Sequence, residues 1–304
     1  MIVKDFCFAS ASGLCDIHAR AMTPDEGEPK AVVQITHGMA EHKERYMWLA
    51  ERLTEAGYAV YFMDLLGHGE SVASEDDLGY FGDDGVNSLL KDMRELNEIG
   101  HSELPGLPYV MFGHSMGSFL TRAYTAKYPS TFDAAVYCGT SGPNGAAKIG
   151  LMMAKSAEKK DPHDRPAKLN NMAFGSYNKR TENRTPVDWL SRETGNVDAY
   201  AADPLCGFCF TSNGFVTLMT VLISVSGSDW AAKVPNVPIY LIAGGEDPVG
   251  QYGKGVEKVR KMLEKTGHTK VAMKLYPGDR HEIFNEVDKE QVTADLIAWL
   301  GQLA

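Results

Sequence analysis

Residues 109–120 read Y-V-M-F-G-H-S-M-G-S-F-L, in which an apolar run passes through a glycine-rich turn straight into a segment with helical apolar spacing. The pattern predicts a buried β-strand over residues 109–112 and a helix that begins directly after Ser115. A turn this tight strains the serine, and flanking glycines, here Gly113 and Gly117, let the neighbouring backbones pass. The serine hydroxyl is therefore expected at the carboxyl edge of a sheet, above a helix N-terminus whose dipole favours developing negative charge.

Strand-like and helix-like segments alternate on both sides of this turn. An opening hairpin is expected around Ser12-Gly13, between the runs 2–10 and 14–21. Further apolar strand runs, each followed by a segment of helical period, cover residues 31–36, 58–63, 134–138, 239–243 and 271–276. This alternation predicts the α/β class, with a mostly parallel sheet flanked by helices.

The alternation breaks between residues 143 and 235. This stretch is rich in Asn, Lys, Met and Gly and then turns apolar toward its end. It is too long for an idle loop. We therefore expect a core built from residues 1–142 and 236–304, with residues 143–235 inserted as a cap or lid.

Length, charge and cysteine content limit the classes of protein and partner. The 304 residues are 44% hydrophobic and 23% charged, which is enough for one large domain or two small ones. Thirty Lys and Arg against forty Asp and Glu give a formal charge of −10, so no nucleic-acid partner is expected. No run approaches ~18 apolar residues, and the N-terminus lacks the succession of a secretory signal. Five irregularly spaced cysteines fit reduced thiols in a cytoplasm.

A serine at its free pKa is a poor nucleophile, so a base and an orienting acid should accompany Ser115. In this architecture both lie on loops after late strands, with the acid before the histidine in the chain. The strand run 271–276 ends in P-G-D-R-H-E, and its His281 is the histidine that follows a late strand. We predict that His281 is the general base.

The orienting acid is expected after the preceding strand run, which ends in G-G-E-D-P-V. Asp247 is predicted for this role because the proline that follows it fixes the turn. Glu246 and Asp279 are the alternatives, although Asp279 stands too near His281 in the chain to turn round easily.

An oxyanion hole needs two backbone N–H groups aimed at the tetrahedral oxygen. One is expected from Met116, which follows the serine, and the other from the loop after the first parallel strand, with Met39 as donor. His37, Glu41 and His42 in the same loop have the wrong spacing for a zincin helix, so no metal site is predicted.

Two other motifs are incomplete. Gly67-His68-Gly69 resembles the start of a dinucleotide fingerprint, but Val72 stands where a third glycine belongs, and there is no Walker loop. No cofactor is therefore predicted. Cys206 and Cys209 form a C-x-x-C pair that no thioredoxin-like strand precedes, so no redox role is predicted either.

Five segments carry a family resemblance: H-G-M-A-E-H-K-E-R-Y (37–46), D-L-L-G-H-G-E-S (64–71), G-H-S-M-G-S (113–118), G-E-D-P-V-G (245–250) and R-H-E (280–282). In this order they resemble the α/β-hydrolase group of lysophospholipases and monoacylglycerol lipases, which is related to serine aminopeptidases. The resemblance implies the α/β-hydrolase fold and Ser115, Asp247 and His281 as a catalytic triad. It also implies that the amides of Met39 and Met116 form the oxyanion hole.

The apolar end of the inserted segment suggests an acyl pocket. An equally weighted alternative is that these side chains form a helix face packed on the core. The residues considered are Phe208, Phe210, Phe215, Leu218, Met219, Leu222 and Ile223.

Residues 154–186 carry eight Lys and Arg against four Asp and Glu. A solvated loop is the expected interpretation, and attraction to anionic headgroups is the alternative. Membrane-surface contact is therefore expected to be transient at most.

These residues predict a serine hydrolase that cleaves carboxylic esters with one medium or long acyl chain, such as monoacylglycerols or lysophospholipids. An aminopeptidase for small N-terminal residues is an alternative, because acidic cap residues could hold a substrate ammonium. A ligand receptor that kept the fold is a third possibility, and an intact triad argues against it. The acidic cap residues considered for binding a substrate ammonium are Asp188, Glu193, Asp198 and Asp203. The sequence makes no prediction about oligomeric state.

Overall fold

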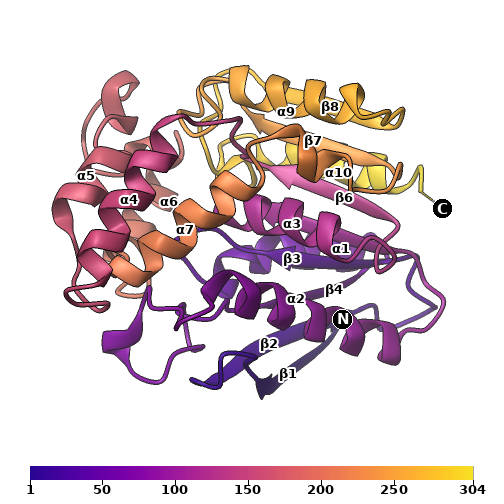
Figure 1. The fold of residues 1–304 in the computed structure, drawn as a ribbon. Coiled ribbons are helices and arrows are strands. Elements are labelled where there is room, and N and C mark those ends of the chain that lie inside the picture. The colour runs from indigo at the N-terminus through magenta and orange to yellow at the C-terminus, as the bar shows by residue number, and fades with distance from the viewer. Residues whose placement is uncertain (304) are drawn as a thin grey trace.

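In a computed structural model of the chain, which describes residues 1–303, eight strands form one sheet in the order β1-β2-β4-β3-β5-β6-β7-β8 (Figure 1). The first two strands pair as an antiparallel hairpin, β2 runs antiparallel to β4, and the remaining neighbours are parallel. The α/β class with a mostly parallel sheet is confirmed. The strands are β1 (Ile2–Ala9), β2 (Asp16–Thr23), β3 (Val32–Thr36), β4 (Ala59–Met63), β5 (Tyr109–His114), β6 (Ala134–Cys138), β7 (Ile239–Gly244) and β8 (Val271–Tyr276).

Helices cover both faces of this sheet because its central strands are apolar on both sides. In β5, Met111 packs in the cluster that includes α2 and α3, and the next residue, Phe112, packs in the cluster that includes α1 and α10. Side chains of a strand alternate between faces, so one short strand holds both layers to the sheet. The helices of the core are α1 (Met47–Glu55), α2 (Gly85–Glu103), α3 (Met116–Lys127), α9 (Lys254–Lys265) and α10 (Lys289–Leu300), with 3₁₀ turns η1 (Lys43–Tyr46), η2 (Glu75–Asp77) and η5 (Ile283–Asn285).

The parallel register brings the loops with the predicted site residues to one edge of the sheet. Strand ends pair directly there: Thr36 with Gly113, His114 with Cys138, and Gly244 with Tyr276. The loops that follow β3, β5, β7 and β8 therefore start side by side, at the carboxyl edge where α/β proteins bind ligands.

Between β6 and β7 the chain forms only helices, of which α4, α5, α6 and α7 gather beyond the carboxyl ends of the strands (Figure 1). Gly150 of α4 lies against α7, where an added Cβ would stand 3.2 Å from Met219 Sδ, so the two helices pack closely. The bounds 143–235 for a separate cap stay a prediction. The helices of this segment are α4 (Ala146–Glu158), α5 (Ala167–Phe174), η3 (Tyr177–Arg180), η4 (Asp188–Leu190), α6 (Thr194–Ala202), α7 (Ser212–Ser224) and α8 (Ser228–Ala231). Within residues 1–303, no helix has the length and apolar character needed to cross a membrane.

Candidate active site

Ser115 stands on the turn between β5 and α3 with a strained backbone, at φ 53° and ψ −121°. A Cβ on Gly113 would lie 2.3 Å from the carbonyl oxygen of Gly117, and a Cβ on Gly117 would lie 2.2 Å from that of Thr36. Both positions therefore require glycine. The Ser115 N–H donates to the Cys138 carbonyl at 3.0 Å, which ties the turn to β6.

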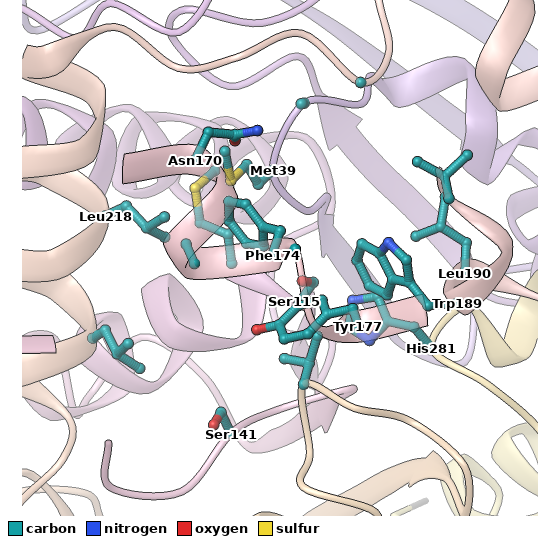
Figure 2. Close-up of a pocket in the computed structure, with 18 of the residues that line it drawn as sticks. Met39, Ser115, Ser141, Asn170, Phe174, Tyr177, Trp189, Leu190, Leu218 and His281 are labelled. Atoms are coloured by element: carbon teal, nitrogen blue, oxygen red, sulfur yellow. The ribbon is translucent and has the colours of Figure 1, made fainter. Parts of the chain in front are cut away.

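His281 and Asp247 form an ion-pair contact. His281 Nδ1 lies 3.0 Å from Asp247 Oδ2, and no other group within residues 1–303 hydrogen-bonds to either atom. The other oxygen of Asp247 accepts the Val249 N–H at 2.8 Å, which orients the carboxylate. With Nδ1 facing the acid, Nε2 is the nitrogen left for the cavity that His281 and Ser115 both line (Figure 2).

The two alternative acids lie elsewhere. Glu246 is half-exposed, with one carboxylate oxygen 3.4 Å from Arg180. Asp279 is buried and forms an ion pair with Arg192. The structure thus brings Asp247, and neither Glu246 nor Asp279, to the imidazole.

Met39 and Met116, the two predicted oxyanion-hole residues, both line the cavity. The amides on either side of Met39 are occupied: the Gly38 N–H donates to Glu41 Oε1 at 2.5 Å and the Ala40 N–H to His68 Nε2 at 3.2 Å. Within residues 1–303 the Met39 N–H has no acceptor. Met116 is the first residue of α3, where N–H groups lack a partner inside the helix.

The conformation of the Met39 loop is fixed from two sides. Ala40 adopts φ 51°, and its carbonyl accepts from the Gly207 N–H and the Tyr200 hydroxyl, both at 2.9 Å. Burial lowers the pKa of His68 to about 3, so the ring is neutral and its Nε2 can accept a hydrogen bond from the Ala40 N–H. His68 therefore supports the loop, a role that sequence reasoning did not assign to it.

A buried ionic network joins the Met39 loop to the serine turn and to the His281 loop. Burial raises the pKa of Glu41, but the hydrogen bond from His114 and the charge of Arg45 outweigh this and hold the pKa below its usual range. Burial lowers the pKa of His114, but the same contact with Glu41 raises it overall. A charged His114 can donate from Nδ1 to Glu41, at 3.4 Å, and from Nε2 to the His281 carbonyl, at 3.2 Å.

Arg45 completes this network, because it pairs with Glu41 at 2.9 Å and with Glu282, next to His281, at 2.5 Å. Asn196 of α6 also donates to Glu282, at 2.7 Å. Glu41, Arg45, His114 and Glu282 stand in the quoted family segments, but nothing local in the sequence indicates that they meet. Two buried carboxylates, those of Glu41 and Glu282, thus share the guanidinium of Arg45.

The cavity has a volume of about 400 Å³. Of the predicted acyl-pocket residues, Phe208, Leu218, Met219 and Leu222 line it.

Phe210 and Phe215 require a correction. Neither lines the cavity, and both are completely buried in the apolar core. The centroid of the Phe210 ring lies 5.2 Å from that of Phe81 and 5.3 Å from that of His68. The core interpretation is therefore the right one for these two aromatic residues.

Several cavity residues come from parts of the insertion that gave no sequence signal. The ring centroid of Trp189, in η4, lies 5.1 Å from that of His281, and the Trp189 carbonyl accepts the His281 N–H at 3.4 Å. Asn170, Phe174 and Tyr177 also line the cavity, and the Tyr177 ring packs against Trp189 with a centroid distance of 4.9 Å (Figure 2). Only the folded insertion brings these residues to the serine.

The carboxylates that an aminopeptidase would need do not line the cavity. Asp188 accepts from the backbone of Arg184 and Thr185, Asp198 pairs with Arg184, and Asp203 contacts His42. Glu193 caps α6. The acidic side chains that do line it, Glu41 and Glu282, are the two already paired with Arg45.

The three residues of the rejected zincin pattern also point apart. The ring of His37 contacts the Gly38 carbonyl at 2.8 Å and accepts the Leu65 N–H at 2.9 Å. Glu41 faces the network behind the serine, and His42 turns to Asp203.

Comparison with known proteins identifies the family to which the chain is similar. A family model described as serine aminopeptidase, S33, matches residues 27–288. The monoacylglycerol lipase of Mycolicibacterium smegmatis is 29% identical, over 98% of this chain and 96% of that protein. The human monoglyceride lipase is 26% identical, over 91% of this chain and 84% of its own length. A thermostable carboxyl esterase from Bacillus coagulans, solved with glycerol, has a TM-score of 0.94 and 34% identity, and the match covers 100% of this chain and 99% of that one.

Proposed function

The chain belongs to the serine aminopeptidase, S33, family of α/β-hydrolases and is a carboxylic ester hydrolase, and on this premise we propose that it acts through an acyl-enzyme on Ser115. Its proposed substrates are lipid esters with one medium or long acyl chain, such as monoacylglycerols or lysophospholipids. The observation that carries the proposal is the pairing of Asp247 with His281 at 3.0 Å, at the wall of the cavity that also holds Ser115.

In the first half-reaction the Ser115 hydroxyl attacks the ester carbonyl while His281 Nε2 takes its proton. The new C–O bond moves the carbonyl electron pair onto oxygen, and the amides of Met39 and Met116 stabilise that oxyanion. Asp247 holds the imidazole in the required tautomer and stabilises the imidazolium. The imidazolium then protonates the leaving alcohol as the original C–O bond breaks.

In the second half-reaction water replaces the alcohol. His281 removes a proton from this water, which attacks the acyl carbonyl, and the same amides bind the second oxyanion. The Ser115–acyl bond breaks, the serine recovers its proton from His281, and the free carboxylic acid leaves. No cofactor takes part in either step.

The lining of the cavity supports an acyl substrate. Its volume of about 400 Å³ falls within the usual range of small-molecule sites. Leu218, Met219 and Leu222 of α7 and Ala147 and Gly150 of α4 together form an apolar part of its wall. An acyl chain that lies along this wall would gain ~25 cal/mol for each Å² of apolar surface it buries. We propose that residues 143–235 act as the cap that forms this wall.

Esters suit this site better than peptides. A substrate ammonium needs an unpaired carboxylate, and both acidic side chains at the cavity share the guanidinium of Arg45. The relatives named as monoacylglycerol or monoglyceride lipases support the same substrate class.

Hydrolysis of p-nitrophenyl esters from two to sixteen carbons tests the proposal, with the Ser115→Ala protein as the blank. We expect serine-dependent turnover that peaks at eight or more carbons. A peak at acetate would contradict the lipid substrate and leave the esterase mechanism. Turnover of aminoacyl p-nitroanilides in place of esters would favour the peptidase.

A further inference from the structure

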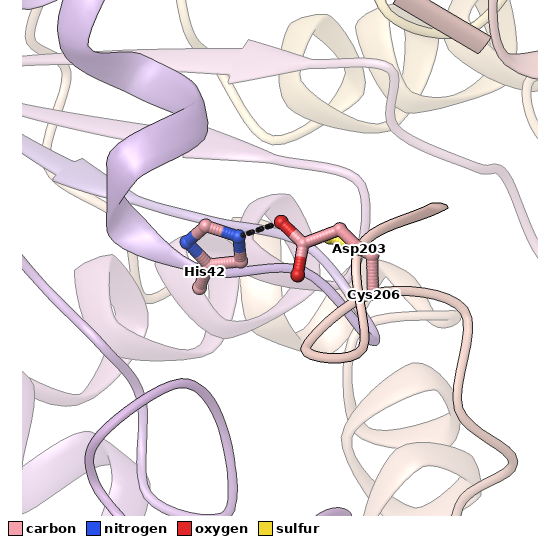
Figure 3. A group of neighbouring side chains, drawn as sticks. All are labelled: His42, Asp203 and Cys206. Carbon is pink, nitrogen blue, oxygen red and sulfur yellow. Dashed lines mark hydrogen bonds and ion pairs between the residues drawn. The ribbon is translucent and has the colours of Figure 1, made fainter. Parts of the chain in front are cut away.

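Three ligand-type side chains converge outside the catalytic cavity, where the cap meets the core. They are His42, which follows the Met39 loop, and Asp203 and Cys206, which precede the cavity residue Gly207 (Figure 3). His42 Nε2 lies 2.8 Å from Asp203 Oδ2, and the nitrogen, a carboxylate oxygen and the sulfur all lie within 4.8 Å of one another. His42 and Cys206 are each 8% exposed.

From this geometry we propose that His42, Asp203 and Cys206 form a binding site for a borderline-soft divalent cation of the Zn²⁺ class. Imidazole nitrogen, thiolate sulfur and carboxylate oxygen are the ligands that such ions prefer, whereas Ca²⁺ and Mg²⁺ prefer oxygen alone. Three protein ligands leave a fourth tetrahedral position for water.

The required rearrangement is small. Bonds of ~2.0 to 2.3 Å around a tetrahedral ion set its ligands roughly 3.3 to 3.8 Å apart. The His42–Asp203 contact of 2.8 Å must therefore open by about 0.5 Å, and the sulfur, within 4.8 Å of both atoms, must approach by about 1 Å at most. Asp203 keeps its other oxygen on the Leu205 N–H, at 2.8 Å, which fixes the carboxylate while it shifts. On binding, the Cys206 thiol loses its proton to solvent and the thiolate electron pair forms the metal–sulfur bond.

The surrounding charges permit a cation there. Arg45 is the basic side chain whose charge acts on both Asp203 and Cys206, and it is already paired with Glu41 and Glu282. Within residues 1–303 the Cys206 sulfur has no hydrogen-bond partner, so coordination replaces no existing bond to it.

The site bridges two segments that shape the oxyanion hole. The Gly207 N–H and the Tyr200 hydroxyl, on either side of the two cap ligands, both donate to the carbonyl of Ala40, next to Met39. An ion that joins Cys206 to His42 therefore fixes the cap against the Met39 loop. We expect the bound ion to restrain the cap and to slow turnover.

The first test is metal binding by chelator-treated protein, measured with Zn²⁺ against a chromophoric chelator and with Co²⁺ as a spectroscopic probe. We expect one ion per chain and a thiolate-to-cobalt charge-transfer band. Cys206→Ser should lose the band and bind Zn²⁺ at least ~100-fold more weakly, since even a residue that supports a ligand costs 10- to 100-fold. Cys209→Ser, which removes a nearby half-buried thiol outside the cluster, should keep both.

Asp203→Asn provides a second variant in case Cys206→Ser folds poorly, which the melting temperature in chelator reports. An unchanged Zn²⁺ affinity in Cys206→Ser would overturn the proposal, because the ion would then bind elsewhere, for example at Cys7 and its neighbour His18. So would the absence of the cobalt band in the unmodified protein.

The second test measures the effect on catalysis. Saturating Zn²⁺ should slow ester hydrolysis several-fold in the unmodified protein and in Cys209→Ser but not in Cys206→Ser. Equal inhibition of Cys206→Ser would place the inhibitory ion elsewhere, and tight binding without inhibition would overturn the restraint on the cap. The binding readouts do not depend on the proposed substrate, so they separate a failure of this site from a failure of the proposed function.

Discussion

Replacing Gly117 by Ala tests whether the close approach of the serine turn to the Met39 loop sets the catalytic geometry. The new Cβ would lie 2.2 Å from the carbonyl oxygen of Thr36 and 2.3 Å from that of His37. Both are backbone atoms, which cannot rotate away as the end of a side chain can. The Met116 amide and the Met39 amide must therefore separate.

The size of the effect follows from these distances. Real Cβ atoms essentially never approach within 3.0 Å, so the two backbones must move apart by about 1 Å. A misplacement of ~1 Å at a catalytic centre costs roughly 10²-fold in rate. Overpacking of this kind also lowers the free energy of unfolding by about 1–3 kcal/mol.

The assay is kcat and KM for p-nitrophenyl octanoate together with the melting temperature. Gly100→Ala is the matched control, because its Cβ would lie 2.8 Å from the Tyr109 hydroxyl, near the amino end of β5. We expect both variants to lose stability and only Gly117→Ala to lose about 100-fold in kcat. A folded Gly117→Ala protein with kcat within threefold of the unmodified value would refute the reasoning.

Three further changes test separate parts of the site. Asp247→Asn should lower kcat by about 10³- to 10⁴-fold, because the amide no longer fixes the tautomer of His281; an activity loss under tenfold would exclude this role. Burial, together with the charges of neighbouring carboxylates, raises the pKa of Asp279 to about 7. The folded protein therefore holds this proton more tightly than the unfolded chain, and the resulting stability, complete below about pH 4, is lost as pH rises through 7. The melting temperature of Asp279→Asn should therefore rise relative to the unmodified protein between pH 4 and pH 8, and a constant difference would contradict the shift. Leu218→Trp should lower kcat/KM about tenfold for esters of twelve or more carbons and leave acetate unchanged; an equal loss at all lengths would remove Leu218 from the acyl wall.

The parallel sheet could be predicted because its information is local. Each strand from β3 onward is a mostly apolar segment of five or six residues, and helical spacing follows most of them. The proposed triad could be predicted for the same reason, since Ser115, Asp247 and His281 each stand within five residues of the end of a strand. Parallel strands end at one edge, so strand order alone brings such residues together.

The cavity wall could not be predicted in the same way. Helical spacing identifies an apolar face on α7 but not what covers it. Leu218 and Met219 of α7 line the cavity, whereas Phe215 of the same helix is completely buried in the core. Phe210 is held in place by a close approach to Gly79. A Cβ added to Gly79 would lie 2.9 Å from the Cα of Phe210, and this contact joins segments that are far apart in the chain.

The buried ionic network could not be predicted from the sequence for a related reason. Glu41 and Arg45 look like an ordinary exposed pair four residues apart. Their burial depends on His114 and Glu282, which arrive from two other strand ends. Periodicity within one segment carries no information about such a meeting.

The most direct test of the central claim is the mass of the trapped acyl-enzyme. Protein mixed with p-nitrophenyl octanoate and quenched in acid within the first turnover is analysed intact and after proteolysis. Our account expects one octanoyl group per chain on the peptide that contains Ser115, and neither adduct nor turnover in Ser115→Ala. Turnover retained by Ser115→Ala, or an octanoyl group on a different residue, would contradict it.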